Sequence, residues 1–184
     1  DRLTAHDAAT GNTLWVCEGF NPDAKPMWRS IASASVWNDV AVVPYGRGRN
    51  LCGIDLRNGL DPAKRWLWNR DRLGSDVPTP VTQAGKAYVL EDGGKLVCID
   101  MMTGNTLWTS TAPRGHGRYY ASPILAGSKL YCVSEKGVVI VGDVEQAFSN
   151  ATVNKMNEGI ISTPVAVDNR LLLRGAKHLF CIGQ

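Results

Sequence analysis

The chain has 184 residues, of which 44% are hydrophobic and 20% charged, as is ordinary for a globular protein with a buried core. The net charge of +3 gives little support for binding nucleic acid or a membrane surface. No apolar run approaches the roughly 18 residues of a membrane-spanning helix, so we expect neither a transmembrane segment nor a nucleic-acid partner.

Residues 1–20 predict two short strands joined by a hairpin. In "RLTAHDAATGNTLWVCE", Asp7 can accept backbone N–H bonds within the turn, and Gly11 supplies the positive φ of a bulged hairpin. Trp15 then lies on the second strand, where its ring can bury against a neighbouring sheet.

Residues 30–72, 77–111 and 119–156 each predict four short strands. The phrases "ASVWND", "TPVTQAGK", "SPILAGSK" and "TPVAVDNR", anchored on Val36, Val81, Ile124 and Val165, recur at spacings of 45, 43 and 41 residues. Between them run alternating apolar stretches punctuated by turn residues, and no window shows a helical stripe. Units of about 40–45 residues with four strands each are the signature of β-propeller blades.

The hairpin phrase itself recurs in two of these blades. We expect its tryptophans to fasten each blade to the next at the outer rim. The blade at 119–156 keeps Asp143 but lacks the glycine turn and the tryptophan, so we expect it to dock more loosely. The predicted docking residues are Asp7, Gly11 and Trp15, then Asp55, Gly59 and Trp68, where the phrase carries an insertion, and Asp100, Gly104 and Trp108.

Residues 160–184 predict the first three strands of a further blade, complementary to the third and fourth strands at 1–20. The whole chain, 1–184, is therefore predicted to be one all-β propeller domain with about four blades of antiparallel strands. It can be a partial propeller, a four-bladed ring or half of an eight-bladed assembly. Because it opens in the middle of a blade, we expect a processed or trimmed piece of something longer.

The phrase "AHDAATGNTLW" and its copy "CIDMMTGNTLW" closely resemble the tryptophan-docking motif of the pyrroloquinoline-quinone-like, or quinoprotein-type, propeller repeat family. The resemblance covers essentially the whole chain and is weakest at 143–158. It implies an exported bacterial protein, periplasmic or extracellular. The family includes dehydrogenases and proteins without cofactor, and this chain resembles in kind the non-enzymatic propeller lipoprotein of outer-membrane barrel assembly.

Catalytic members of that family have a pair of adjacent cysteines and acidic ligands to calcium. This chain has no Cys-Cys dipeptide and no acidic cluster, and its three histidines fall in different repeats. We therefore expect no catalytic residue, no metal site and no cofactor, with pyrroloquinoline quinone and calcium as the alternative. The five cysteines are expected to be mainly buried free thiols.

Propeller geometry places the loops between second and third strands, and those between blades, on one face. Arginines and aromatic residues are frequent in these loops, although the loops can also be simply solvated. The leading function is a non-enzymatic scaffold that binds a protein or peptide ligand there. The alternatives are a fragment of a quinone-dependent dehydrogenase, or carbohydrate or small-anion binding at a central mouth near Ser35, Thr79, Ser122 and Thr163. A homodimer or the missing blades of a parent chain are further expected partners. The candidate ligand-binding residues are Trp28, Arg47, Arg49, Arg114, His116, Arg118 and Tyr119.

Overall fold

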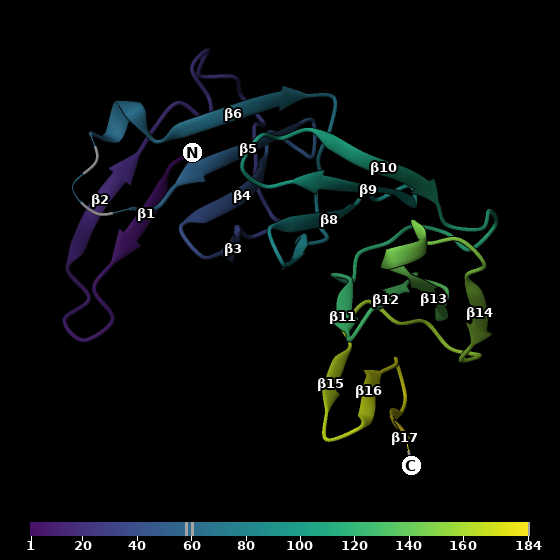
Figure 1. Cartoon of the computed structure of the whole chain (residues 1–184). Coiled ribbons are helices and arrows are strands. Elements are labelled where there is room, and N and C mark those ends of the chain that lie inside the picture. Colours follow the sequence, from purple (N-terminus) through teal and green to yellow (C-terminus); the bar gives the residue numbers. More distant parts are fainter. Residues whose placement is uncertain (58, 60, 184) are drawn as a thin grey trace.

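The computed structural model describes residues 1–57, 59 and 61–183, so that Asn58, Leu60 and Gln184, the last residue of the predicted final blade, lie outside the described part. Five antiparallel sheets follow one another along the chain (Figure 1). The first sheet has two strands, β1 (Leu3–His6) and β2 (Thr13–Cys17), and the last has three, β15 (Val165–Val167), β16 (Arg170–Arg174) and β17 (Leu179–Gly183).

Three complete four-stranded sheets lie between these ends. Each has its strands in sequence order, which is the order expected of a propeller blade. Their strands are β3 (Ser35–Trp37), β4 (Val40–Tyr45), β5 (Asn50–Asp55) and β6 (Trp66–Asp71); β7 (Val81–Gln83), β8 (Lys86–Leu90), β9 (Lys95–Asp100) and β10 (Thr106–Thr111); β11 (Ile124–Ala126), β12 (Lys129–Val133), β13 (Val138–Asp143) and β14 (Thr152–Lys155). Two short 3₁₀ turns, η1 (Pro62–Lys64) and η2 (Val144–Gln146), precede fourth strands. No helix within the described residues is long and apolar enough to cross a membrane.

The sheets are arranged as blades of an open propeller. The first strands approach one another, β3 against β7 and β11 against β15. The N- and C-terminal sheets lie at opposite ends of the arc (Figure 1), and among the described residues β1 pairs only with β2 and β17 only with β16. The prediction of an all-β propeller with four-stranded antiparallel blades is confirmed. Within the described residues the two end sheets are not paired with each other. That they are halves of one split blade stays a prediction.

A chain of hydroxyl groups links the blades near their first strands. The backbone N–H of Ser33 donates to Thr79 Oγ1 at 3.0 Å, and the N–H of Thr79 donates to Ser122 Oγ at 2.9 Å. The N–H of Ser122 in turn donates to Thr163 Oγ1 at 3.1 Å. Each blade is therefore bonded head to tail to the next, and we call this series the inner hydroxyl chain.

The hydrophobic core fills the spaces between neighbouring sheets. Val42 and Leu51 from one blade cluster with Val89 and Ile99 from the next, and all four are fully buried. The last sheet has no neighbour beyond it. Leu179 is therefore 65% exposed, although its position in the third strand resembles that of core residues in the complete blades.

The cysteines follow the same pattern of burial. Cys17, Cys52, Cys98 and Cys132 are buried free thiols, as predicted, whereas Cys181 on β17 is free and exposed. Its exposure has the same cause as that of Leu179, since no further blade covers this sheet.

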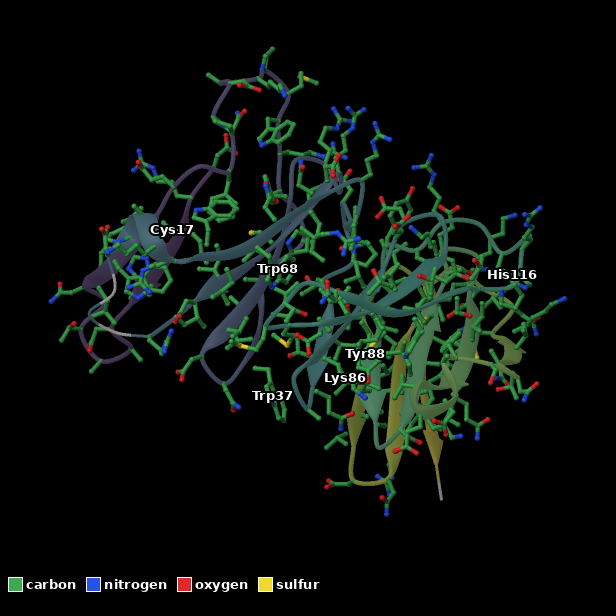
Figure 2. The ribbon with its side chains drawn as sticks, turned by 45° about the horizontal axis from the view of Figure 1, so that its top comes forward. Cys17, Trp37, Trp68, Lys86, Tyr88 and His116 are labelled. Carbon is green, nitrogen blue, oxygen red and sulfur yellow. The ribbon has the colours of Figure 1, made fainter. Side chains whose placement is uncertain are left out.

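Trp68 on β6 occupies the rim between two complete blades (Figure 2). A Cβ at Gly53 would lie 2.3 Å from the indole, and a Cβ at Gly104 in the next blade would lie 2.5 Å from its other side. The indole N–H donates to the carbonyl of Met101 at 2.8 Å. The ring thus fits between two glycines of different blades, and a side chain at either position would displace it.

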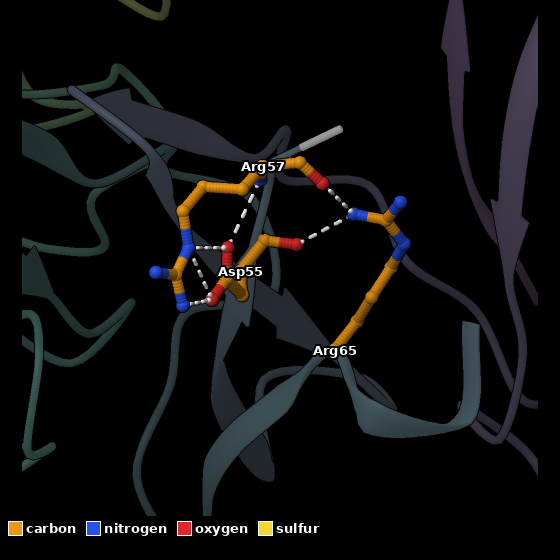
Figure 3. A network of polar contacts seen from close by, with 3 residues as sticks. All are labelled: Asp55, Arg57 and Arg65. Carbon is orange, nitrogen blue, oxygen red and sulfur yellow. Dashed lines mark hydrogen bonds and ion pairs between the residues drawn. The ribbon is translucent and has the colours of Figure 1, made fainter. Parts of the chain in front are cut away.

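Trp15 makes a different contact because of the insertion before β6. Its ring lies under the guanidinium of Arg65, 4.0 Å from the ring centroid, whereas no atom lies within 4 Å of a Cβ built on Gly59. Arg65 is buried and donates to the carbonyls of Asp55 and Arg57 at 2.9 and 3.1 Å (Figure 3). Arg65 is therefore the group that Trp15 meets at this hairpin.

The remaining rim positions differ again. Trp108 is half-buried, with its ring centroid 5.9 Å from that of Tyr88 in the same blade. In the blade at β11–β14, Thr152 pairs with Val141 in the register where the other blades have tryptophan, and an open groove of about 550 Å³ lies between Val153 and the last sheet. Looser docking of that blade stays a prediction.

In the repeated hairpin turns, the aspartate side chain accepts hydrogen bonds from within the turn, as expected for a short carboxylate. Asp7 accepts the N–H and the hydroxyl of Thr10 at 2.7 and 2.8 Å, and Asp100 accepts the same two groups of Thr103 at 2.8 and 2.9 Å. These hydrogen bonds stabilise the ionised carboxylates and hold the pKa of both below its ordinary value. The glycine that follows has φ of +74° at Gly11 and +71° at Gly104, where only glycine is unstrained.

Candidate functional site

A polar hollow of about 630 Å³ opens on the loop-bearing face of the arc. Five separate segments contribute to it: the residues before β3, the β4–β5 turn, the β6–β7 loop, the β8–β9 turn and the loop before β11. Of the predicted ligand-binding residues, the structure brings four together in its lining, namely Trp28, Arg47, Arg49 and Arg118.

The β4–β5 turn is a tight platform rather than a loose loop. Gly46, Arg47 and Gly48 all have positive φ, at +63°, +61° and +71°. A Cβ at Gly46 would meet the Trp28 ring at 2.4 Å, and one at Gly48 would meet the backbone N of Asp76 at 2.5 Å. The glycines let the turn pack against its own protein. Glycine is therefore required at both positions for the turn to pack closely.

Trp28 is held in place beneath this turn. Its indole N–H donates to the carbonyl of Phe20 at 2.6 Å, and its ring meets that of Tyr45 edge-on at 6.4 Å. Tyr45 is buried, and its hydroxyl donates to Asn69 at 2.9 Å. The wall of the hollow is thus fixed by packing on three sides.

The two carboxylates in the lining are already engaged. Arg29 donates to both oxygens of Asp76, at 3.2 and 2.5 Å, and the contact with Asp76 raises the pKa of Arg29. Asp92 accepts the backbone N–H of Asp76 at 3.1 Å. These acids brace the loops, and their charge is partly neutralised.

The guanidinium groups of Arg47, Arg49 and Arg118 behave differently. Within the described part of the chain, none of the three makes a side-chain hydrogen bond or an ion pair, and all three are exposed. Arg47 is anchored only through its backbone, whose N–H donates to the carbonyl of Arg29 at 2.8 Å. Three guanidinium groups therefore face the same hollow with their donors available.

The other predicted ligand-binding residues lie outside this lining. Tyr119 is only 2% exposed, and a Cβ at Gly94 would come within 2.8 Å of its ring, so it is a core residue. Burial raises its pKa to about 12. Arg114 and His116 lie in the same interblade loop, and neither lines the hollow.

Several further cations of the predicted loop face serve internal contacts. Arg70 donates to the carbonyl of Gly104 at 2.6 Å, and Arg174 donates to that of His178 at 3.2 Å. His178 contacts the carboxylate of Glu158 at 3.1 Å. Composition alone could not separate these arginines from the free ones.

The central mouth is also occupied by protein contacts. Thr79, Ser122 and Thr163 accept the bonds of the inner hydroxyl chain, and Ser35 donates its hydroxyl to the carbonyl of Pro80. These hydroxyls hold blades together. No group of three His, Cys, Asp or Glu side chains that could hold a metal occurs in the described part of the chain.

The radial four-stranded sheets, the aspartate–glycine hairpins and the rim tryptophan resemble those of propellers built from pyrroloquinoline-quinone-like repeats. Comparison with known proteins confirms the resemblance to this family. A repeat model described as "Outer membrane protein assembly factor BamB" matches residues 60–149, just under half of the chain.

Individual relatives carry the same description. The chain is 27% identical over 125 residues to outer membrane protein assembly factor BamB of Escherichia coli, covering 68% of this chain and 30% of that protein. It is 25% identical over 187 residues to the Kangiella koreensis protein of that name, covering 93% of this chain and 42% of the relative. It therefore spans less than half the length of either relative. The crystal structure of BamB from Moraxella catarrhalis matches with a TM-score of 0.72 at 19% identity, over 99% of this chain and 52% of that one, and supports the fold.

Proposed function

We propose that this chain is part of a non-enzymatic propeller scaffold in outer membrane protein assembly, which binds a protein or peptide partner through its loop-bearing face. Its relatives are described as outer membrane protein assembly factors, which supports a role in that assembly. Similarity to them favours an exported protein of the periplasm. The observation that carries the binding role is the convergence of three unpaired guanidinium groups on one hollow of that face.

The framework suits binding because it is rigid. In this proposal the rim tryptophans and the inner hydroxyl chain dock the blades, so that the loops of different blades keep a fixed spacing. A preformed surface loses little conformational freedom when a partner binds. Arginine beside fixed aromatic rings is also the composition found in the centres of protein interfaces.

The apolar faces at the ends of the arc belong to the same proposal. Leu179 on β17 is 65% exposed, and a further blade beside this sheet would bury it. Such blades can come from a longer parent chain or from a second copy. A mass measurement in solution distinguishes a single chain from a two-copy assembly.

A cross-linking experiment in intact bacteria tests which face binds. A photoreactive amino acid replaces Met27 at the hollow, which is 80% exposed, or Lys86 near the β7–β8 turn, which is also exposed and serves as the matched control. We expect Met27 to yield a discrete cross-link to a component of the assembly machinery and Lys86 to yield none. Equal cross-linking from both positions, or a cross-link from Lys86 alone, would contradict the assignment of the face.

The competing dehydrogenase function has a direct test in the same preparation. Pyrroloquinoline quinone and calcium are added to the purified chain, and bound-cofactor absorbance and dye reduction are measured. We expect neither signal; dye reduction above the level of free cofactor would replace the scaffold proposal.

A further inference from the structure

We infer that the hollow beside the β4–β5 turn binds an extended acidic peptide segment of the partner protein, through the guanidinium groups of Arg47, Arg49 and Arg118. The inference rests on the proposed scaffold function and names the chemistry of its ligand. A carboxylate is the natural counterpart of a free guanidinium, because the two planar groups can form two parallel charge-assisted hydrogen bonds.

The charges around the hollow are unbalanced in favour of an anion. Arg47, Arg49 and Arg118 have no acidic partner within the described residues, whereas the two acids in the lining already bind other groups: Asp76 binds Arg29, and Asp92 binds backbone N–H. Unpaired arginine side chains that line the same hollow repel one another, and a ligand that carries several carboxylates offsets this repulsion.

The same lining favours a peptide over a phosphate or a nucleic acid. A volume of about 630 Å³ exceeds what one small anion fills and falls within the range of ligand pockets. The carboxylates of Asp76 and Asp92 lie among the arginines, so they oppose a dense negative charge. Each carboxylate has about four lone-pair sites, so both can still accept a backbone N–H group beside the bonds they already make. A peptide offers both carboxylates and N–H donors.

The rim of the hollow adds an apolar contact. Met27 is 80% exposed and adjoins Trp28, which is fixed by its hydrogen bond to Phe20. An exposed methionine beside a held indole can cover an aliphatic side chain of the ligand. The ligand is therefore expected to alternate acidic and apolar residues.

The backbone of Arg47 supports a functional use of its side chain. Arg47 has φ of +61° between two glycines that also have positive φ, so glycine would be less strained at this position as well. Other non-glycine residues of the chain, such as Arg72, also have positive φ, and Arg47 differs from Arg72 because its unpaired guanidinium lines the hollow. The strain places one guanidinium at the edge of the hollow.

Arg72 provides a matched control for this residue. It is also an exposed arginine with positive φ, at +57°, and its side chain makes only a 3.8 Å contact with Asp71. It does not belong to the lining of the hollow. Replacing either arginine by glycine removes one positive charge and relieves the same backbone conformation, but only Arg47→Gly changes the hollow.

The probe is a fluorescently labelled twelve-residue peptide in which glutamate alternates with leucine and serine, measured by anisotropy against the intact chain. We expect the wild type and Arg72→Gly to bind it equally, and Arg47→Gly to bind it about tenfold more weakly, the loss of one charge-assisted contact. The same peptide with glutamine in place of glutamate is expected not to bind. Folding of each variant is checked by circular dichroism.

Three results would overturn the inference. Equal binding by Arg47→Gly and Arg72→Gly would show that the hollow does not bind the peptide. Equal binding of the glutamine peptide would show that binding does not depend on the carboxylates. Tighter binding of inorganic phosphate or of a single-stranded oligonucleotide than of the peptide would assign another ligand class. Cross-linking from Met27 is scored separately: if it persists unchanged in Arg47→Gly while peptide binding fails the test, the scaffold function stands and the acidic ligand does not.

Discussion

The fit of Trp68 between two glycines predicts a measurable energetic coupling across the blade interface. Replacing Gly104 by alanine places a Cβ about 2.5 Å from the indole, at a backbone position with φ of +71°. We expect about 1 kcal/mol for the left-handed conformation and about 2 kcal/mol for the overpacking. Gly104→Ala should therefore lower the free energy of unfolding by about 3 kcal/mol.

Three further variants separate these contributions. Gly11 occupies the equivalent turn of the first sheet with φ of +74° and has no atom within 4 Å of an added Cβ, so Gly11→Ala should cost only about 1 kcal/mol. Trp68→Ala removes a half-buried indole and the donor to the Met101 carbonyl, and should cost about 3 kcal/mol. In the Trp68→Ala background, Gly104→Ala has nothing to collide with and should cost about 1 kcal/mol again.

Urea unfolding followed by far-ultraviolet circular dichroism measures the wild type and all four variants without depending on tryptophan fluorescence. The double-mutant cycle should give a coupling energy of about 2 kcal/mol between positions 68 and 104. Additive effects at these two positions, or equal costs for Gly104→Ala and Gly11→Ala, would refute the rim contact as a source of stability.

Three other outcomes follow from single residues. In the native protein only Cys181 should react quickly with a thiol reagent, because burial protects the other four and raises the pKa of Cys132 to about 12; fast labelling of more than one thiol per chain would contradict this. Hydrogen bonds from Thr103 lower the pKa of Asp100, so its contribution to stability is complete above the unfolded value of about 3.9 and is lost as the pH falls through the lower folded value. Asp100→Asn should accordingly show a smaller loss of unfolding free energy between neutral and acidic pH than the wild type, and parallel curves would exclude the turn as the cause. Relief of the left-handed backbone should make Arg47→Gly more stable than the wild type by about 0.5 kcal/mol in urea unfolding, and a destabilised variant would show that the turn is not strained.

The architecture could be predicted because the same turn and docking residues recur at a nearly constant spacing in successive repeats. Asp100, Gly104 and Trp68 each occupy the place that the phase of the phrase assigns, since turn formation and indole packing depend on local residues and a fixed spacing. The insertion before β6 changes the spacing of the phrase in that blade. Trp15 contacts a buried arginine, Arg65, which the sequence analysis did not single out, because the path of the longer hairpin brings it there.

The candidate site was predictable only in outline. The sequence places arginines in the correct loops, but pairing with distant groups decides which are free: Arg29 binds Asp76, 47 residues away, while Arg47 binds no side chain in the described region. Tyr119 shows the same limit, because its burial depends on the neighbouring Gly94 turn. The hydroxyls of the inner chain carried a signal in their spacing of 43 and 41 residues between Thr79, Ser122 and Thr163, which could have suggested contacts between blades.

The inner hydroxyl chain has a direction, and that direction restricts how the arc can grow. Every link joins an amide of one sheet to the oxygen of the following sheet, so the two sides of a sheet are chemically unlike. In a heterologous contact of this kind, one side of each sheet always meets the opposite side of the next sheet. A series of such contacts is completed only when the sheets close into a ring. Any additional sheet, whatever its origin, must enter with the same polarity, and an isologous dimer that joins two like ends cannot reproduce these bonds.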